Sequence, residues 1–292
     1  MNEDPNLVRL IDLALAEDVG AGDWTTEWTV DPGAEGKAVI VAKEPLVVSG
    51  IGAASAVFRK VDRALLVTAE VDEGAAVEPE AVVLRLEGSL RAILIGERVA
   101  MNFLGHLSGI ATLTREYADA VAGTGARIMD TRKTTPGWRM LEKAAVRAGG
   151  GENHRFGLHD MILVKDNHLV AAGGVRRAVE KVRDANRAGL KVEVEVTTLD
   201  QLDEVLPLGL DRILLDNMDP GTMEEAVKRI RLLGPDRPLV EASGNMSLSS
   251  VGRVAETGVD LISVGALTHS APSADLSLRV LSSSMNLRNS KR

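Results

Sequence analysis

The second half of the chain alternates between two hydrophobic patterns. Short runs rich in Val, Ile and Leu are separated by longer segments in which hydrophobic residues recur every three or four positions. The runs predict β-strands, and the longer segments predict amphipathic helices. We expect strands at 127–130, 161–165, 191–196, 212–216, 238–241 and 260–264. We expect helices between them at 138–148, 174–187, 199–206, 220–232 and 248–257. This order is typical of successive parallel βα units in a barrel-like array.

The first part of the chain has a mixed pattern. It predicts helices at 6–16 and 52–60, a two-part β stretch at 36–49, β segments near 64–71 and 81–86, and a long bridging helix at 91–123. The fold class is therefore α/β, with an N-terminal α+β domain at 1–106 and an α/β barrel domain at 107–270. We expect the Ser-rich tail at 271–292 to pack on the first domain and to fray.

Composition restricts the class of protein. Hydrophobic residues make up 45% of the 292 residues and charged residues 26%, which is usual for a folded, water-soluble protein. The chain has no cysteine, so thiol nucleophiles and thiolate metal sites are excluded, and a cytoplasmic location is expected. No window approaches the length of a membrane-spanning helix. A net charge of −8 and only seven aromatic residues make nucleic acid an improbable partner.

The charge is distributed unevenly along the chain. Residues 127–165 contain eight cations and four acids, whereas the rest of the chain contains 26 cations and 38 acids. A basic segment inside an acidic protein is typical of a site for a small polyanion, because local positive charge must overcome the surrounding repulsion. Lys143 and Arg147, four residues apart on a predicted helix, are interpreted as solvated surface charges instead.

Polar residues lie at the ends of five of the six predicted strands of the second half, and small residues lie at the end of the last one. The residues after the strands are Asp130-Thr131-Arg132-Lys133, Lys165-Asp166-Asn167-His168, Glu195, Asp216-Asn217, Glu241-Ala242-Ser243-Gly244-Asn245 and Val264-Gly265-Ala266. In βα barrels the functional groups come from the loops at the carboxyl ends of the strands. We therefore expect one functional site at this rim. Glu193 and Glu195 share one strand face whose other side is valine, so at least one of them must meet polar surroundings.

Several motifs resemble those of the quinolinate phosphoribosyltransferase family. They are DTRKTTPGWR at 130–139, GGGENHRFGLHDMILVKDNH at 149–168, EVEV at 193–196, LLDNM at 214–218, EASGN at 241–245 and VGALTHS at 264–270. LALAEDVGAGDWTT at 13–26 and ERVAMNFLGHLSGIAT at 97–112 extend the resemblance over nearly the whole chain. The order and spacing of the motifs agree with the family, so the resemblance is specific.

The resemblance implies a reaction and an architecture. Quinolinate and phosphoribosyl pyrophosphate are converted to nicotinate mononucleotide, pyrophosphate and CO₂, with Mg²⁺, in NAD biosynthesis. The family has an N-terminal α/β sandwich and an incomplete seven-stranded α/β barrel, one strand more than the pattern predicts. It also forms homodimers in which an arginine reaches the active site of the partner, and Arg98 matches that arginine.

The resemblance also assigns residues to the two substrates. Quinolinate is a planar dianion, and guanidinium groups are well suited to paired carboxylates. We expect its site to contain Arg98, Thr131, Arg132, Lys133, His154 and Arg155. We expect phosphoribosyl pyrophosphate to contact Lys165, Glu195, Asp216, Ser243, Gly244, Asn245, Gly265 and Ala266. Glu195 and Asp216 are also the expected Mg²⁺ ligands, since Mg²⁺ prefers hard oxygen donors, and with Lys133 and Lys165 they form the expected catalytic set.

The remaining histidines and one tryptophan have other expected roles. His269 is close enough in sequence to the small-residue loops to touch phosphate, whereas structural hydrogen bonds are expected for His106, His159 and His168. Trp138 replaces a smaller aliphatic residue of the family pattern, and we interpret it as a packing residue that shields the anion pocket.

Three alternative functions stay open at this point. A relative of the family acting on another acceptor, such as nicotinate, would leave positive charge unpaired in a desolvated pocket. A Schiff-base aldolase or lyase would use Lys165 at the end of its strand as the nucleophile. A non-catalytic anion-binding protein would not require Glu195 and Asp216 beside the cations.

Overall fold

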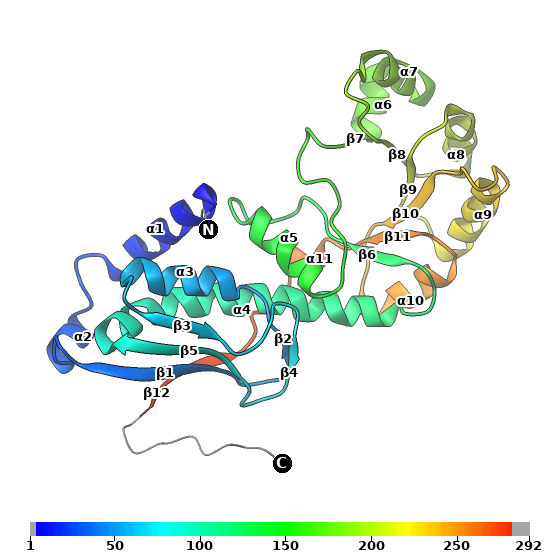
Figure 1. The fold of residues 1–292 in the computed structure, drawn as a ribbon. Coiled ribbons are helices and arrows are strands. Elements are labelled where there is room, and N and C mark those ends of the chain that lie inside the picture. Colours follow the sequence, from blue (N-terminus) through cyan, green and yellow to red (C-terminus); the bar gives the residue numbers. More distant parts are fainter. Residues whose placement is uncertain (1–3, 282–292) are drawn as a thin grey trace. The chain divides into compact units, whose positions relative to one another are not determined.

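The computed structural model of the protein describes residues 4–281, which form two compact units (Figure 1). The first unit contains the described parts of Met1–Leu113, Pro136–Gly149 and Ala271–Arg292, and the second contains Thr114–Thr135 and Gly150–Ser270. Helix α4 (Leu90–Ala120) contributes to both units, so the expected boundary at residue 106 falls inside a continuous helix. Within residues 4–281, no helix combines the length and apolar character needed to cross a membrane.

The first unit is built around a four-stranded antiparallel sheet in the order β12-β1-β5-β3. Its strands are β1 (Glu35–Ala42), β3 (Leu66–Ala69), β5 (Val82–Ser89) and β12 (Leu276–Leu281), and β2 (Leu46–Val47) pairs separately with β4 (Ala76–Val77). Its other helices are α1 (Pro5–Val19), α2 (Trp24–Thr29), α3 (Ile51–Val61) and α5 (Arg139–Ala148). The buried side of α3 carries Val57 and Phe58, which are fully buried, as is Ile40 of β1.

Strand β12 departs from the expectation that the tail frays. It pairs antiparallel with β1, from Lys37 opposite Leu281 to Ala42 opposite Leu276. Leu276 is buried, and the pairing satisfies the backbone groups along one edge of β1. The expectation was therefore wrong for 276–281, and residues 282–292 lie outside the described part of the chain.

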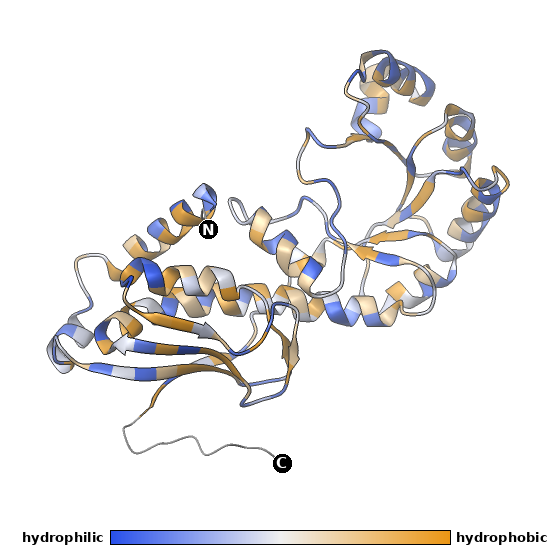
Figure 2. Ribbon diagram, viewed as in Figure 1, coloured by the Kyte–Doolittle hydropathy of each residue, from blue (hydrophilic) through white to orange (hydrophobic). Residues whose placement is uncertain are grey.

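The second unit contains a six-stranded parallel sheet in the order β6-β11-β10-β9-β8-β7. Its strands are β6 (Arg127–Met129), β7 (Ile162–Val164), β8 (Val192–Val196), β9 (Arg212–Asp216), β10 (Leu239–Ser243) and β11 (Leu261–Ser263). Helices α7 (Val175–Ala185), α8 (Leu199–Val205), α9 (Pro220–Arg231) and α10 (Leu248–Glu256) follow the outer side of the curved sheet (Figure 1). These strands are mostly hydrophobic, whereas the helices mix both kinds of residue (Figure 2). The predicted mixed α/β fold class is confirmed.

A single backbone bridge lies beyond the edge strand β6. Glu152 forms an isolated parallel bridge with Met129 at the outer edge of β6. Its backbone N–H donates to the carbonyl of Ile128 at 2.8 Å, and its carbonyl accepts from the N–H of Asp130 at 3.2 Å. Among the described residues the sheet has the six strands that the hydrophobic pattern predicts, without the seventh strand that the resemblance implies.

Short elements account for most of what the pattern missed. Besides α2 and β4, they are α6 (Asp166–Ala172), α11 (Ala266–His269) and a 3₁₀ turn at Leu206–Leu208. Each is too short to show a hydrophobic period, and local hydrogen bonds define their ends. For example, the Asp23 side chain caps α2 by accepting the N–H of Thr26 at 3.0 Å.

Candidate active site

A pocket of about 800 Å³ lies at the carboxyl ends of the parallel strands, and all of its lining residues belong to the second unit. The strand ends and the loop after Glu152 bring together the predicted site residues Thr131, Arg132, Lys133, His154, Arg155, Lys165, Glu195, Asp216, Ser243, Gly244, Asn245, Gly265 and Ala266. Arg98 is not among the lining residues; it lies exposed on α4, in the first unit. The parallel sheet therefore gathers groups that are widely separated in sequence.

Cations form one part of the pocket wall. Burial and the positive charge of Arg132 lower the pKa of the Arg155 guanidinium. The Arg155 Nη1 also donates to the carbonyl of Met161 at 3.1 Å, which orients the side chain. The carbonyl of Lys133 accepts from the Thr268 hydroxyl at 2.8 Å, joining this loop to the loop after β11. Like charges that face one another in a partly buried pocket are stabilised by a bound anion.

Carboxylates form a second part of the wall. Glu195, whose side chain is 10% exposed, accepts from Lys165 Nζ at 2.8 Å. Asp216 Oδ2 accepts from the side-chain amide of Asn217 at 2.7 Å. Both acids line the pocket together with the cations. The two carboxylates are hard oxygen donors of the kind that Mg²⁺ uses when most of its other ligands are water and substrate phosphate.

The loop after β10 has a sterically demanding backbone. Gly244 has φ +105°, and a Cβ atom there would lie 2.3 Å from Asn217 Oδ1. Asn217 and Asn245 both adopt left-handed backbone conformations, with φ of 53° and 46°. The N–H of Asn217 donates to the carbonyl of Ser243 at 3.0 Å, which ties the two loops together. Such conformations concentrate at functional sites and give close access to backbone N–H groups.

Asn217 has no role in the sequence prediction, although it lines the pocket. A signal was present, because asparagine directly after the last residue of a strand tolerates the left-handed region better than most side chains. His269, which we expect near phosphate from the sequence, also lines the pocket. Its Nδ1 lies 2.6 Å from the Ser270 hydroxyl.

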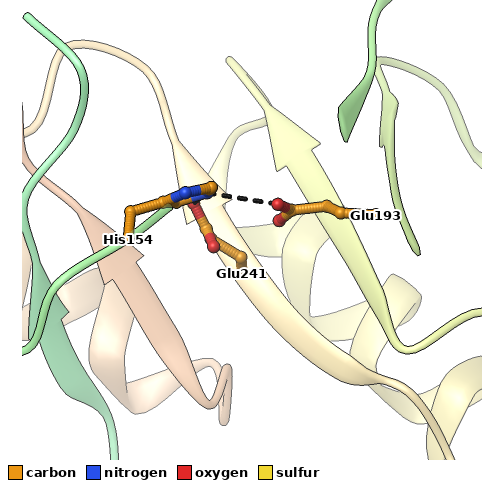
Figure 3. Close-up of side chains that lie close together, drawn as sticks. All are labelled: His154, Glu193 and Glu241. Atoms are coloured by element: carbon orange, nitrogen blue, oxygen red, sulfur yellow. Dashed lines mark ion pairs between the residues drawn. The ribbon is translucent and has the colours of Figure 1, made fainter. Parts of the chain in front are cut away.

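A buried charged cluster of His154, Glu193 and Glu241 (Figure 3) adjoins the pocket, and His154 and Glu241 line it. His154 Nε2 is 3.1 Å from Glu193 Oε2 and 3.4 Å from Glu241 Oε1. Glu241 also accepts from Arg212 Nη1 at 2.7 Å and from the Ser263 hydroxyl. Both glutamates are fully buried. Of these three residues, the sequence predicts a substrate contact only for His154. It places Glu241 at the expected rim without a role, and Glu193 only on a strand face shared with Glu195.

The environment of this cluster shifts its proton affinities. Burial alone would lower the pKa of His154, but hydrogen bonds and charges from Glu193 and Glu241 raise it to about 9. Burial also opposes ionisation of Glu241, yet His154, Ser263 and Arg212 hold its pKa below the usual range. For Glu193, burial and the charge of Glu241 prevail and raise the pKa.

The same three residues have the spacing of a metal site, with ligand atoms within 4.8 Å of one another. The chemistry does not fit a cation, because Arg212 already pairs with Glu241 and the Nε2 atom of His154 faces both carboxylates. We therefore interpret the cluster as an ion-pair network.

The three remaining histidines and Trp138 lie away from the pocket lining. His106 pairs with buried Glu142 at 2.8 Å, and His168 Nδ1 accepts the N–H of Lys165 at 3.0 Å, both structural bonds of the expected kind. His159 is exposed. Trp138 packs within the first unit, stacked on Phe103 with ring centroids 4.6 Å apart.

The fold and the pocket define a class of protein. A parallel α/β sheet that presents cations, two carboxylates and small-residue loops at one rim is typical of an enzyme acting on phosphorylated, anionic substrates. Sequence models of the quinolinate phosphoribosyl transferase family match residues 23–108 as the N-terminal domain and 110–279 as the C-terminal domain. The chain belongs to this family.

Individual relatives agree over almost their whole length. A probable nicotinate-nucleotide pyrophosphorylase [carboxylating] of Synechocystis is 44% identical over 267 residues, covering 91% of this chain and 90% of that protein. A protein of the same description from Bacillus subtilis is 41% identical, with 94% and 93% covered. The structure of the nicotinate-nucleotide pyrophosphorylase from Francisella tularensis superposes with a TM-score of 0.90 at 37% identity, covering 96% of this chain and 98% of that one.

Proposed function

We propose that the protein is a decarboxylating quinolinate phosphoribosyltransferase. It transfers the phosphoribosyl group of phosphoribosyl pyrophosphate to quinolinate, giving nicotinate mononucleotide, pyrophosphate and CO₂ for NAD biosynthesis. One observation carries the proposal: cations suited to a dianion and carboxylates suited to a phosphoribosyl donor line a single pocket. Family membership over both parts of the chain supports the same conclusion.

In this reaction the cations bind and orient the pyridine dicarboxylate. Arg132 and Arg155 pair with its carboxylates, with Thr131, Lys133 and His154 beside them. The ring nitrogen then attacks ribose C1 while the C1–O bond to pyrophosphate breaks, and that electron pair leaves with the pyrophosphate oxygen. The ring becomes cationic and accepts the electron pair left at C2 when CO₂ departs; a proton then adds at C2.

The other part of the pocket stabilises the donor. Glu195 and Asp216 lie where they can face the ribose as positive charge develops, and Lys165 neutralises the pyrophosphate. The Ser243–Asn245 loop and Gly265-Ala266 would hold the 5′-phosphate through backbone N–H groups. We infer that Glu195 and Asp216 also hold Mg²⁺, which would add charge neutralisation at the leaving pyrophosphate.

We also propose that the protein forms a homodimer. Arg98 lies exposed on α4 and matches the arginine with which the family completes the partner's site. Mixing Arg98→Ala with Glu195→Gln chains tests this. Each variant alone should be inactive, whereas random subunit exchange should restore about a quarter of wild-type activity, because half of a heterodimer's sites are intact. Absence of restored activity in dimers shown to have exchanged subunits would contradict the role of Arg98.

The central experiment is an assay with Mg²⁺ and phosphoribosyl pyrophosphate that offers quinolinate and nicotinate separately. Product and CO₂ from quinolinate alone are expected. Product from nicotinate alone would keep the donor site and overturn the dianion pocket. If neither yields product, borohydride trapping at Lys165 would distinguish a lyase from an anion-binding protein. A cytoplasmic location stays a prediction from the absence of cysteine.

A further inference from the structure

The charged cluster of His154, Glu193 and Glu241, together with Asp130, connects one irregular loop to strands β6, β8 and β10. The loop between α5 and β7 carries Arg155, and it pairs with the backbone of the sheet through the isolated bridge at Glu152. An arginine that binds a planar dianion needs a fixed backbone, because guanidinium recognition depends on direction as well as charge. The structure must therefore hold this loop by side chains.

The backbone of the loop is held from β6. Buried Asp130, directly after β6, accepts the N–H of His154 at 2.9 Å through Oδ1. Its Oδ2 accepts from the side-chain amide of Asn153 at 2.6 Å. These bonds fix the main chain immediately before Arg155.

The imidazole ring is held from β8 and β10. Glu193 and Glu241 both approach Nε2 of His154, and the three side chains converge as Figure 3 shows. On its other side the ring accepts the backbone N–H of Arg155 at its Nδ1, with an N–N distance of 2.7 Å. Both ring nitrogens are thus directed at protein groups, and the ring links two buried carboxylates to the backbone of Arg155.

The proton arrangement follows from these contacts. Two carboxylates beside Nε2 favour a proton on that nitrogen, and the N–H aimed at Nδ1 favours a lone pair there. The Nε2–H is common to the neutral ring and to the imidazolium. Arg212 balances part of the negative charge of the two glutamates. Its guanidinium donates to Glu241, and its Cα lies opposite that of Glu193 in the sheet register.

Such a network is costly for a fold that could bury hydrophobic residues instead. Replacing a buried ion-pair network by hydrophobic side chains of similar volume is often neutral or stabilising. In addition, neither oxygen of Glu193 has a hydrogen bond of good geometry, although both are buried. Stability alone does not account for two glutamates at this position.

We propose that Glu193 and Glu241 are positioning residues for quinolinate: their carboxylates, 3.1 and 3.4 Å from Nε2 of His154, hold that ring by charge against the Arg155 backbone and so orient the Arg155 guanidinium in the anion pocket. The proposal rests on the proposed function. It assigns the two glutamates an effect on one substrate only. Phosphoribosyl pyrophosphate, at the strand ends around Asp216 and Ser243, should be affected little.

The test uses Glu193→Gln and Glu241→Gln, which keep the side-chain shape and remove the charge. Each should raise the KM for quinolinate by roughly tenfold while the KM for phosphoribosyl pyrophosphate and kcat change less than about threefold. If the effect passes through Arg155, adding Glu241→Gln to Arg155→Lys should raise the KM little beyond that of Arg155→Lys. Independent, multiplying effects would overturn the proposal.

A matched control comes from the same sheet. Asp260 forms an ion pair with Arg237 away from the pocket lining, so Asp260→Asn removes a partly buried carboxylate without touching the proposed linkage. It should lower thermal stability and leave both KM values unchanged. If the glutamate variants behave like Asp260→Asn while the wild type turns over quinolinate, the inference fails alone. If the wild type does not use quinolinate, the proposed function fails with it.

Nitrogen NMR of His154 in the wild-type protein provides a measurement that needs no variant. The spectrum should show a proton on Nε2, with Nε2 hydrogen-bonded. A ring without a proton on Nε2 would overturn the proposed arrangement whatever the stability of the variants.

Discussion

The two ends of the parallel sheet both carry charged residues but arrange them differently. At the amino ends, Arg237 makes two bonds to Asp260, of 2.7 and 2.8 Å, and Asp260 also accepts the N–H of Val240. Asp211 in turn accepts the N–H of Val192. At the carboxyl ends, two arginines lie close enough for the charge of one to lower the pKa of the other.

The charged groups at the amino ends stabilise the fold, whereas the charged groups of the pocket at the carboxyl ends are available to bind a ligand. At the amino ends opposite charges are matched within the protein, so these groups stabilise strand ends. At the carboxyl ends Arg132 and Arg155 lie close to one another beside the Lys165–Glu195 pair, and two asparagines adopt left-handed backbone conformations. The same strands thus provide stability at one end and binding at the other, and four measurements test this contrast.

The largest effect is expected at Glu195. Glu195→Gln keeps the size of the side chain but removes the charge that pairs with Lys165 and faces the developing positive charge. We expect kcat to fall by about 10²–10³-fold, as for the loss of one transition-state electrostatic contact. Steady-state kinetics with both substrates saturating would measure it, and an unchanged kcat would contradict the catalytic role of Glu195.

The next effect is expected at the loop after β10. A methyl group at Gly244 would meet both the side chain and the backbone of Asn217, so Gly244→Ala should raise the KM for phosphoribosyl pyrophosphate by roughly tenfold or more. Gly234→Ala is the control, because Gly234 also has positive φ but open space around it. That variant should lose about 1 kcal/mol of stability and keep its KM values.

At the opposite end of the sheet, Asp260→Asn should lower the free energy of unfolding by about 2–3 kcal/mol, since one partner of a partly buried pair is lost. Chemical denaturation would measure this loss. A change in either KM would contradict the view that the amino ends are structural.

The smallest effect concerns pH. The folded pKa of His154, about 9, exceeds its ordinary value of 6.5, so the stabilisation is complete below pH 6.5 and is lost as pH rises through 9. The charged groups involved are Glu193, Glu241 and Arg212. The free energy of unfolding should therefore fall as pH rises from 6.5 to 9.5. In His154→Gln this decrease should be smaller, and equal slopes in both proteins would contradict the assignment.

Much of the fold and the pocket could be predicted because both depend on local pattern. The six strands of the parallel sheet follow from short hydrophobic runs, and the polar residues behind them meet because parallel strands end at one rim. The motifs then related those residues to known chemistry.

What escaped prediction depends on contacts between distant segments. Nothing in the sequence around Leu276 indicates that β1 needs an edge partner, and α5 follows a predicted barrel strand although it belongs to the first unit. The convergence of Glu193 and Glu241 on His154 depends on which faces of β8 and β10 meet that residue. Strand alternation gives a face for each residue but not its neighbour across the sheet.

The pairing of β12 with β1 has a consequence for how the protein is made. Ribosomes release the N-terminus first, so β1 emerges early while its edge partner, about 235 residues later, is still untranslated. The second unit, contiguous from Gly150 to Ser270 apart from one short earlier segment, is complete before that strand exists. During synthesis, the nascent chain must therefore carry an open β1 edge, with unpaired backbone groups, until the final strand arrives.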